Sequence, residues 1–324
     1  MGFIYSQLFK RLPYPAESYA GKTVIVTGSN VGLGKEAARH FARLGVSTLI
    51  LAVRSIEKGT AAKEDIEATT NCAKDVIQVW QLDMASYASV QKFAERVDSE
   101  LNRVDIFIAN AGVARLKYAI VEEDKTTITI NVVSTFLLAA LVMPKLKATA
   151  AQFDTRPTFT ITDSEVHART QLPQKSAPDG ELFVTISGKE TADKYFEQQY
   201  PVSKLLEVFG VRSIAENHPA SVSPVTVNCV NPGPCHSELD RDLKTWGFWL
   251  KKLLLARSTE YGSRTLVHAG SQGKETHGQY LSDCAVAEPA PLVTSKEGKE
   301  LQDRLWGELV KKLDGIKLGV TKNF

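Results

Sequence analysis

The stretch TVIVTGSNVGLG at residues 23–34 decides the fold of this chain. It opens with a short apolar run rich in β-branched residues, which predicts a buried strand at residues 23–28. Glycines and a helical pattern over residues 32–44 follow directly. A glycine-rich turn between a strand and a helix brings together unpaired backbone N–H groups and the positive end of a helix dipole. We therefore expect this turn to hold a pyrophosphate.

Each glycine of the turn has a separate expected role. Gly28 permits the tight turn, Gly32 lets the backbone approach a phosphate, and Gly34 lets the helix pack close to the strand. The spacing is G-x-x-x-G-x-G rather than the more common G-x-G-x-x-G. A glycine-rich turn without any ligand is therefore the alternative reading.

Short apolar runs alternate with helical patterns from residue 23 to about residue 283. This order predicts an α/β fold, a Rossmann-type doubly wound parallel sheet in a three-layer α/β/α arrangement. We expect an N-terminal arm at residues 1–20 and a single domain at 21–324, with a small substrate cap near 235–257. The predicted strands are 23–28, 47–53, 76–83, 105–109, 157–163, 225–230 and 278–282, and the main predicted helices are 32–44, 56–70, 86–100, 123–148, 193–217 and 294–313.

Composition narrows the class of protein. The chain has 324 residues, 43% of them hydrophobic and 23% charged, with a formal net charge of +2. This balance is ordinary for a globular protein and argues against nucleic-acid partners. The four cysteines are scattered, which favours reduced thiols in the cytoplasm, and no metal site is expected. The sequence contains no run of about 18 apolar residues, so no membrane-spanning helix is expected. Peripheral contact with a membrane stays open.

Arg54 bears on the choice of dinucleotide. A site that selects NAD places an acidic residue about 20 residues beyond the glycines, on the ribose hydroxyl. Arg54 occupies that place at the end of the second predicted strand. Because a guanidinium can pair with a 2′-phosphate, the sequence favours NADP over NAD. The alternative is a solvent-exposed charge at the end of a strand.

Tyr200 and Lys204 lie four residues apart in YPVSK, on one face of a predicted helix. A free tyrosine has a pKa near about 10, and a nearby ammonium should lower it, which would suit a general acid or base. Ser164 ends a predicted strand, where its hydroxyl can bind a carbonyl or carbinol oxygen. Taken alone, the tyrosine and lysine are also compatible with an ordinary surface pair.

Two asparagines occupy unusual places. Asn110 lies in ANAG at another strand end, where Gly112 allows close approach of a cofactor. Asn131 lies within the long predicted helix, where asparagine is a poor helix former. We expect Asn131 to hold a water for proton relay, with a buried amide bonded to backbone as the alternative.

These ordered motifs resemble the short-chain dehydrogenase/reductase family over about residues 21–285. TGSNVGLG is similar to the family's TGxxxGxG loop, ANAG to its NNAG segment with Ala109 in place of the first Asn, and NPGPCHS to its nicotinamide loop. The resemblance implies a catalytic tetrad of Asn131, Ser164, Tyr200 and Lys204. It implies cofactor contacts at Gly28, Asn30, Gly32, Leu33, Gly34, Arg54, Asp83, Asn110, Gly112, Asn131, Tyr200, Lys204, Pro232, Gly233 and Ser237.

Arg54 within AVRS is similar to the NADP-preferring, retinol-dehydrogenase-like branch, which includes many fungal reductases. The resemblance implies an NADP(H)-dependent oxidoreductase that transfers hydride between nicotinamide and a carbonyl or alcohol. In it Tyr200 is the acid or base, and Lys204 lowers its pKa and binds the nicotinamide ribose. Ser164 orients the reacting oxygen. The alternative is a non-catalytic dinucleotide-binding sensor or scaffold.

The substrate side is less defined by the sequence. Residues 238–256 contain Trp246, Phe248 and Trp249, which favours a lid over a bulky, lipophilic or aromatic substrate. Packing of an amphipathic helix and a membrane-facing patch are the alternatives. His167 lies three residues after Ser164 and is a candidate for lining the pocket. A structural role is the alternative, and it is the commoner one for a lone histidine.

The long helix carries VVSTFLLAALVMPKL at residues 132–146, apolar on nearly all sides. Such a helix needs cover from another element. The resemblance implies a partner subunit and hence a homodimer. Cover by the N-terminal arm or by the C-terminal helix would leave a monomer.

Overall fold

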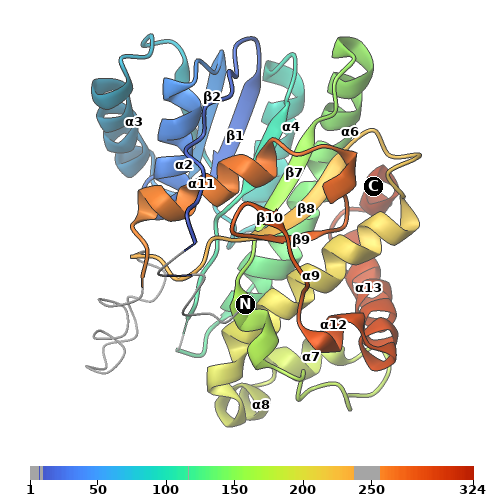
Figure 1. The fold of residues 1–324 in the computed structure, drawn as a ribbon. Coiled ribbons are helices and arrows are strands. Elements are labelled where there is room, and N and C mark those ends of the chain that lie inside the picture. Colours follow the sequence, from blue (N-terminus) through green and yellow to red (C-terminus); the bar gives the residue numbers. More distant parts are fainter. Residues whose placement is uncertain (1–6, 8–9, 116, 237–255) are drawn as a thin grey trace.

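The computed structural model describes residues 7, 10–115, 117–236 and 256–324. Figure 1 shows a twisted central sheet with helices on both faces. The sheet has eight strands in the order β10-β9-β8-β7-β4-β1-β2-β3. The strands are β1 (Thr23–Thr27), β2 (Thr48–Val53), β3 (Ile77–Gln81), β4 (Ile106–Ala109), β7 (Thr158–Thr162), β8 (Thr226–Asn231), β9 (Tyr280–Ser282) and β10 (Ala285–Val286).

All neighbouring strands of this sheet are parallel except β9 and β10, which pair antiparallel. The chain runs outward from β1 to β3, returns to β4 and then runs outward the other way. This order confirms the predicted doubly wound Rossmann-type sheet. The direction in which successive strands are added to the sheet reverses between β1 and β4. The carboxyl ends of these two strands therefore border the crevice in which such folds bind ligands.

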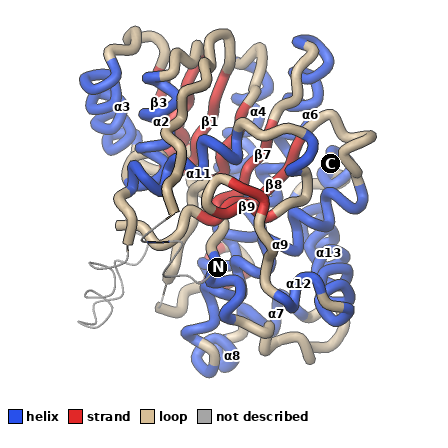
Figure 2. Tube along the Cα trace, in the orientation of Figure 1, coloured by secondary structure: helices blue, strands red, loops and turns tan. Residues whose placement is uncertain are grey.

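The long helices form the two outer layers, as Figure 2 shows. They are α2 (Gly32–Arg43), α3 (Ile56–Thr70), α4 (Tyr87–Glu100), α6 (Ser134–Phe153), α9 (Gln199–Asn217), α11 (Thr259–Gly270) and α13 (Lys296–Ile316). Side chains of β1 alternate between the layers, because successive residues of a strand point to opposite faces. Val24 and Val26 pack with Phe41 of α2, whereas Ile25 packs with Phe93 of α4.

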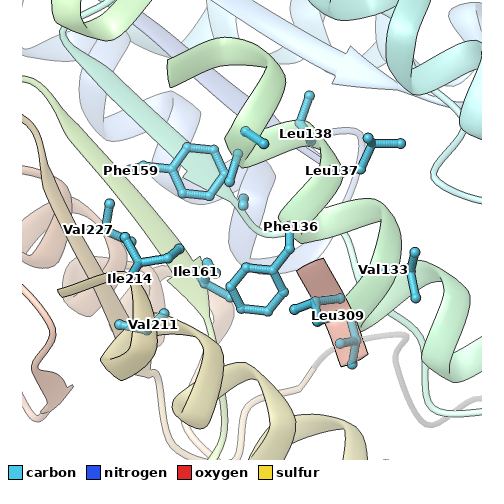
Figure 3. Packing of buried hydrophobic residues seen from close by; sticks show 14 of the residues in the cluster. Val133, Phe136, Leu137, Leu138, Phe159, Ile161, Val211, Ile214, Val227 and Leu309 are labelled. Atoms are coloured by element: carbon cyan, nitrogen blue, oxygen red, sulfur yellow. The ribbon is translucent and has the colours of Figure 1, made fainter. Parts of the chain in front are cut away.

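The Phe136 ring of α6 lies against the backbone of α9 at Gly210. A Cβ atom at Gly210 would lie 2.2 Å from Cζ of Phe136, so any larger residue would displace that ring. Figure 3 shows Phe136 among side chains of β7, α9 and α13, including Ile161, Val211 and Leu309. This contact anchors the helix that carries Tyr200 and Lys204 against the core.

The apolar helix α6 is covered in part by the end of its own chain. Lys147 donates to the carbonyl oxygens of Asn323 at 2.8 Å and Phe324 at 2.5 Å, and the Asn323 amide donates to the Ala140 carbonyl at 3.1 Å. Asn323 ends the short helix η5 (Val320–Asn323), and α13 packs on α9. This cover comes from η5, which follows the C-terminal helix that the sequence analysis considered, and the homodimer stays a prediction.

The helical run Thr126–Phe153 is long and apolar enough to cross a membrane, judged by length and composition alone. Inside the protein, however, 89% of its most apolar stretch is buried. Such burial is typical of the central helix of a globular core. It explains why a helix apolar on every side is found in this chain.

The described part of the N-terminal arm lies against α11. The Tyr261 hydroxyl accepts from the Leu12 amide at 2.7 Å and donates to the Lys10 carbonyl at 3.0 Å. Arg264 donates to the Leu12 carbonyl at 3.0 Å, and the Leu12 side chain is buried. Docking on the body of the protein is thus the observed arrangement for this stretch.

Two boundaries differ from those expected. The helix predicted from residue 123 begins at Thr126, because a hairpin of β5 (Ile120–Val121) and β6 (Asp124–Lys125) precedes it and Glu122 turns with a φ of 56°. The helix predicted from residue 193 begins at Gln199. No helix was predicted at α11 or at the short helices α7 (Leu182–Ser187) and α8 (Lys189–Lys194).

Asp124 explains why the hairpin is stable. Its carboxylate accepts from the Ser187 hydroxyl at 3.0 Å and pairs with Lys312 of α13 at 2.8 Å. These partners are distant in the sequence, so a local pattern does not reveal them.

His277 precedes β9 in the chain and binds the first part of β8, which β9 does not pair with. Its Nδ1 accepts the Val227 amide of β8 at 3.0 Å, and its Nε2 lies 2.9 Å from the His218 carbonyl. These contacts require a neutral ring with its proton on Nε2. Burial accordingly lowers the pKa of His277 below its usual value.

This histidine predicts a loss of stability in acid. The unfolded ring gains its proton near its ordinary pKa and the folded ring only at lower pH, so the stabilisation is lost as pH falls through that window. His277→Asn keeps an oxygen acceptor opposite the Val227 amide but cannot titrate. Its free energy of unfolding in urea should fall less than that of the wild type between about pH 7.5 and about pH 5.5. An equal fall in both proteins would contradict this role.

Candidate active site

The glycine turn leaves no room for larger residues. Gly28 and Gly32 have φ values of 66° and 62°, a region that favours glycine. A Cβ atom at Gly34 would lie 2.8 Å from the Gly28 carbonyl oxygen, and one at Gly28 would lie 3.0 Å from Cα of Ala111. The turn between β1 and α2 is therefore shaped by backbone contacts, as predicted from the spacing of its glycines.

The first turn of α2 fits an anion. Its N-cap residue Val31 makes no side-chain cap, and the first turn holds no acidic residue. The Ser29 hydroxyl donates back to the Val26 carbonyl at 2.8 Å, so it does not cap the helix either. Asn30 and Leu33 are half-buried in the same turn. Backbone N–H groups at the positive end of the helix dipole suit a pyrophosphate.

A junction between β1 and β4 supports this turn. The Thr27 hydroxyl accepts the amides of Asn110 at 2.9 Å and Ala111 at 2.8 Å, and it is fully buried. The Asn110 side chain donates to the Thr27 carbonyl at 2.9 Å. Asn110 thus holds the loop that would carry a cofactor. Sequence reasoning missed Thr27. Its position at the end of β1, where the order of successive strands in the sheet reverses, was a usable signal.

Thr27→Val should destabilise the protein by about 2 to 4 kcal/mol, because two amides would lose their acceptor in a buried place. Thr27→Ser keeps the hydroxyl and should cost about 1 kcal/mol for the lost methyl group. Urea unfolding of both variants measures the difference. Equal losses in the two variants would show that the hydroxyl does not support the junction.

Arg54 and Asp83 follow the carboxyl ends of β2 and β3, on the side of the sheet where the glycine turn lies. The Arg54 side chain is exposed and forms no hydrogen bond or ion pair with any other described residue. Asp83 is half-buried, and its Oδ1 accepts the Ala85 amide at 3.0 Å. Both residues thus lie at the same edge of the sheet as the glycine turn.

Ser164, Tyr200 and Lys204 come together at the carboxyl end of β7. Ser164 follows this strand, and Tyr200 and Lys204 project from α9. The Ser164 hydroxyl lies near enough to the phenol to lower its pKa. The Lys204 ammonium is 5.6 Å from the centroid of the Tyr200 ring. The structure therefore brings together three of the four residues predicted as catalytic.

The pKa of Tyr200 is higher than expected from the sequence. Burial raises it to about 12, helped by the carboxyl groups of Glu207 and Asp163, while Lys204 and Ser164 act to lower it. The expectation of a lowered pKa is wrong for the protein alone, because burial outweighs the ammonium. The phenol therefore keeps its proton at neutral pH.

Asn131 lies in a π-helical turn, η1 (Thr129–Val133), and is fully buried. Its side-chain oxygen accepts the Val113 amide at 2.9 Å, and its nitrogen donates to the Val113 carbonyl and the Ser203 hydroxyl, each at 3.0 Å. This is the alternative considered for it, a buried amide bonded to backbone. Gly112 lies beside it, because a Cβ there would be 3.4 Å from the Asn131 oxygen. A relay water at Asn131 stays a prediction.

His167 has a structural place. Its Nε2 accepts the Ala290 amide at 3.0 Å, so Nδ1 carries the proton and donates to the Ser164 carbonyl at 2.8 Å. Burial lowers the pKa of His167, which keeps the ring neutral. Both ring nitrogens are engaged, and the ring holds the loop that carries Ser164.

The loop after β8 begins with Pro232 and Gly233, the latter with a φ of 74°. The Asn231 side-chain oxygen accepts the amides of Gly233 at 3.0 Å and Glu165 at 3.2 Å. It thereby links this loop to the segment after Ser164. Sequence reasoning missed this asparagine. Ser237 lies outside the described residues.

The predicted cap at 235–257 lies mostly outside the described residues, including Trp246, Phe248 and Trp249. Its two ends are described and adjacent, because the Arg257 amide donates to the Pro234 carbonyl at 2.8 Å and the His236 amide donates to the Arg257 carbonyl at 3.0 Å. Arg257 also pairs with Asp283 at 2.7 Å. The segment thus leaves and rejoins the fold beside Gly233.

Comparison with known proteins agrees with this geometry. Residues 22–152 match the family model described as short chain dehydrogenase. The chain is 69% identical over 324 residues to the short chain dehydrogenase/reductase dmxR8 of Cryptosporiopsis sp., and the match covers 100% of both chains. The chain belongs to the short-chain dehydrogenase/reductase family. It is accordingly an oxidoreductase similar to fungal reductases, as the motifs indicated.

A further relative supports this assignment, and solved structures share the fold. The short-chain dehydrogenase/reductase phmF of Phaeosphaeria nodorum is 40% identical, over 91% of this chain and 87% of the relative. A short chain dehydrogenase from Shigella flexneri, solved with NADP, shares the fold with a TM-score of 0.59 at 20% identity, over 83% of this chain and 99% of its own. RhlG of Pseudomonas aeruginosa, also solved with NADP, has a TM-score of 0.61 at 19% identity, over 83% and 97%.

Proposed function

We propose that this protein is an NADP(H)-dependent oxidoreductase that interconverts a carbonyl group and an alcohol, with Tyr200 as the acid or base. The observation that carries the proposal is the meeting of Tyr200, Ser164 and Lys204 at the carboxyl end of β7. A protein that only senses or scaffolds has no need of such an alignment.

The residues around the glycine turn suit an NADP cofactor. The uncapped first turn of α2 would hold the pyrophosphate. Asp83 and Gly112 follow the ends of β3 and β4, where they would contact other parts of the cofactor. Arg54 is exposed at the end of β2 and would pair with the 2′-phosphate. When bound, the reduced nicotinamide supplies the hydride, and the protein supplies alignment. Structural relatives solved with NADP support this choice.

The protonated phenol suits carbonyl reduction. With a pKa raised to about 12, Tyr200 holds its proton at neutral pH and can donate it to the oxygen of a carbonyl as that oxygen gains negative charge. Ser164 orients the same oxygen through its hydroxyl. The Lys204 ammonium then stabilises the phenolate that remains. In alcohol oxidation the same groups act in the opposite direction.

The substrate we propose is bulky and lipophilic or aromatic. This choice rests on the composition of residues 238–256, which include Trp246, Phe248 and Trp249. The described ends of this segment lie beside Gly233. Aromatic side chains next to a reacting centre favour substrates with large apolar surfaces.

Tyr200→Phe removes the proton donor and should lower kcat by at least about a hundredfold. The assay follows NADPH oxidation with benzil, benzophenone and acetonaphthone. Binding of NADPH, followed by its fluorescence, should persist in the variant. Tyr14→Phe, at an exposed tyrosine of the arm, is the matched control. Undiminished reduction of every accepted ketone by Tyr200→Phe would refute the mechanism.

Arg54→Asp tests the cofactor choice separately. The introduced carboxylate should repel a 2′-phosphate and lower the preference for NADPH over NADH by roughly tenfold or more. Arg96→Asp makes the same change of charge on α4, where Arg96 pairs with Glu100 at 3.0 Å. A preference unchanged in Arg54→Asp would remove Arg54 from the site.

A further inference from the structure

Lys204 is held from behind by groups that the proposed mechanism does not use. Its ammonium donates to the Thr162 carbonyl at 2.8 Å and to both carboxyl oxygens of Glu207 at 2.9 Å. The Lys204 side chain is 6% exposed and that of Glu207 is 2% exposed. A buried ammonium is costly unless an opposite charge compensates it. Glu207 is therefore placed to fix this ammonium under Tyr200.

A second carboxyl group lies behind the first. The side chain of Asp163 has 0% exposure, and neither of its oxygens has a hydrogen-bond donor that meets the usual geometry among the described residues. Asp163 and Glu207 lie near enough for each carboxyl group to alter the pKa of the other. Two buried carboxylates in contact cannot both be ionised, so one proton between them resolves the conflict.

The other groups around the pair do not supply that proton or a second counter-charge. His167 of η2 (Glu165–Arg169) lies 3.5 Å from Asp163, but its ring is neutral for the reasons given above. Burial raises the pKa of Cys229 on β8 and of Tyr280 on β9, so both stay protonated. Further along α9, Arg212 donates to Gln302 at 3.0 Å. Among the residues that the structure describes, the cation that faces the pair is the ammonium of Lys204.

We propose that Asp163 and Glu207 form a carboxyl pair that shares one proton, and that this pair is the positioning and charge-balancing device for Lys204. The inference rests on the proposed function insofar as Lys204 acts on Tyr200. The pair and the ammonium together carry no net charge. Tyr200 therefore faces a neutral group of three side chains rather than an uncompensated cation, which agrees with a phenol that keeps its proton until the reaction draws it away.

The shared proton predicts a particular response to acid. Burial raises the pKa of Asp163 to about 7, so below about pH 7 the pair takes up a second proton and loses its negative charge. Lys204 then loses the anion that holds its ammonium in position beside Tyr200, and the rate should fall. In Asp163→Asn the remaining Glu207 faces the ammonium alone and stays ionised to lower pH, because an opposite charge lowers the pKa of a carboxyl group.

Infrared spectroscopy tests the pair without any need for activity. At about pH 8 the wild type should show the carbonyl stretch of a protonated carboxylic acid, well above the pKa of ordinary carboxyl groups. Asp163→Asn and Glu207→Gln should each lose this band, because the single remaining carboxyl group ionises against Lys204. Glu216→Gln, at a partly exposed glutamate of the same helix, should keep it. Absence of the band in the wild type, or its survival in both single variants, would overturn the proposal.

The pH profile of kcat for acetonaphthone reduction tests the effect on Lys204. The wild type and Glu216→Gln should lose rate below about pH 7, whereas the acid limb of Asp163→Asn should move to lower pH by roughly one unit or more. Glu207→Gln should lower kcat roughly tenfold with little change in the KM for NADPH. An acid limb that stays in place in Asp163→Asn would contradict the role of the pair. If no ketone is reduced by any of the proteins, the proposed function fails, while the infrared result still decides the pair.

Discussion

The buried ammonium of Lys204 is the constraint on which the site depends. A charge in this place must be balanced by neighbouring groups, and those neighbours come from the end of β7 and from the next turn of α9. The same ammonium lies 5.6 Å from the centroid of the Tyr200 ring. The position of the ammonium beside Tyr200, and the net charge there, therefore depend on the groups that bind Lys204. These groups are buried in the protein.

The fold supplies this arrangement through the carboxyl ends of its parallel strands. Thr27 joins the ends of β1 and β4, and Asn231 joins the end of β8 to the loop that carries Ser164. His167 braces the same loop from the C-terminal side. The glycine turn, the serine and the tyrosine thus belong to one connected frame. Gly210 lets α9 approach Phe136 of α6 and so fixes the helix that carries Tyr200.

The doubly wound sheet was predictable from the alternation of short apolar runs with helical patterns, and the candidate site residues were found from short local motifs. The glycine turn, Arg54 at a strand end and the Tyr200–Lys204 spacing are all visible in short stretches. The roles of Glu207 and Asp163 were not predictable, because their contact joins a helix to a strand far away in the sequence. The direction of the Tyr200 pKa shift was missed for a related reason: burial, which outweighs the ammonium, is a property of the whole fold.

A crystal structure of the protein with NADP tests the central claim most directly. The account predicts the pyrophosphate at the first turn of α2, the 2′-phosphate beside Arg54, and the nicotinamide next to Tyr200 on the side of Pro232 and Gly233. It further predicts that Glu207 still holds Lys204 in that complex. A pyrophosphate bound away from the glycine turn, or a nicotinamide out of reach of Tyr200, would contradict the account.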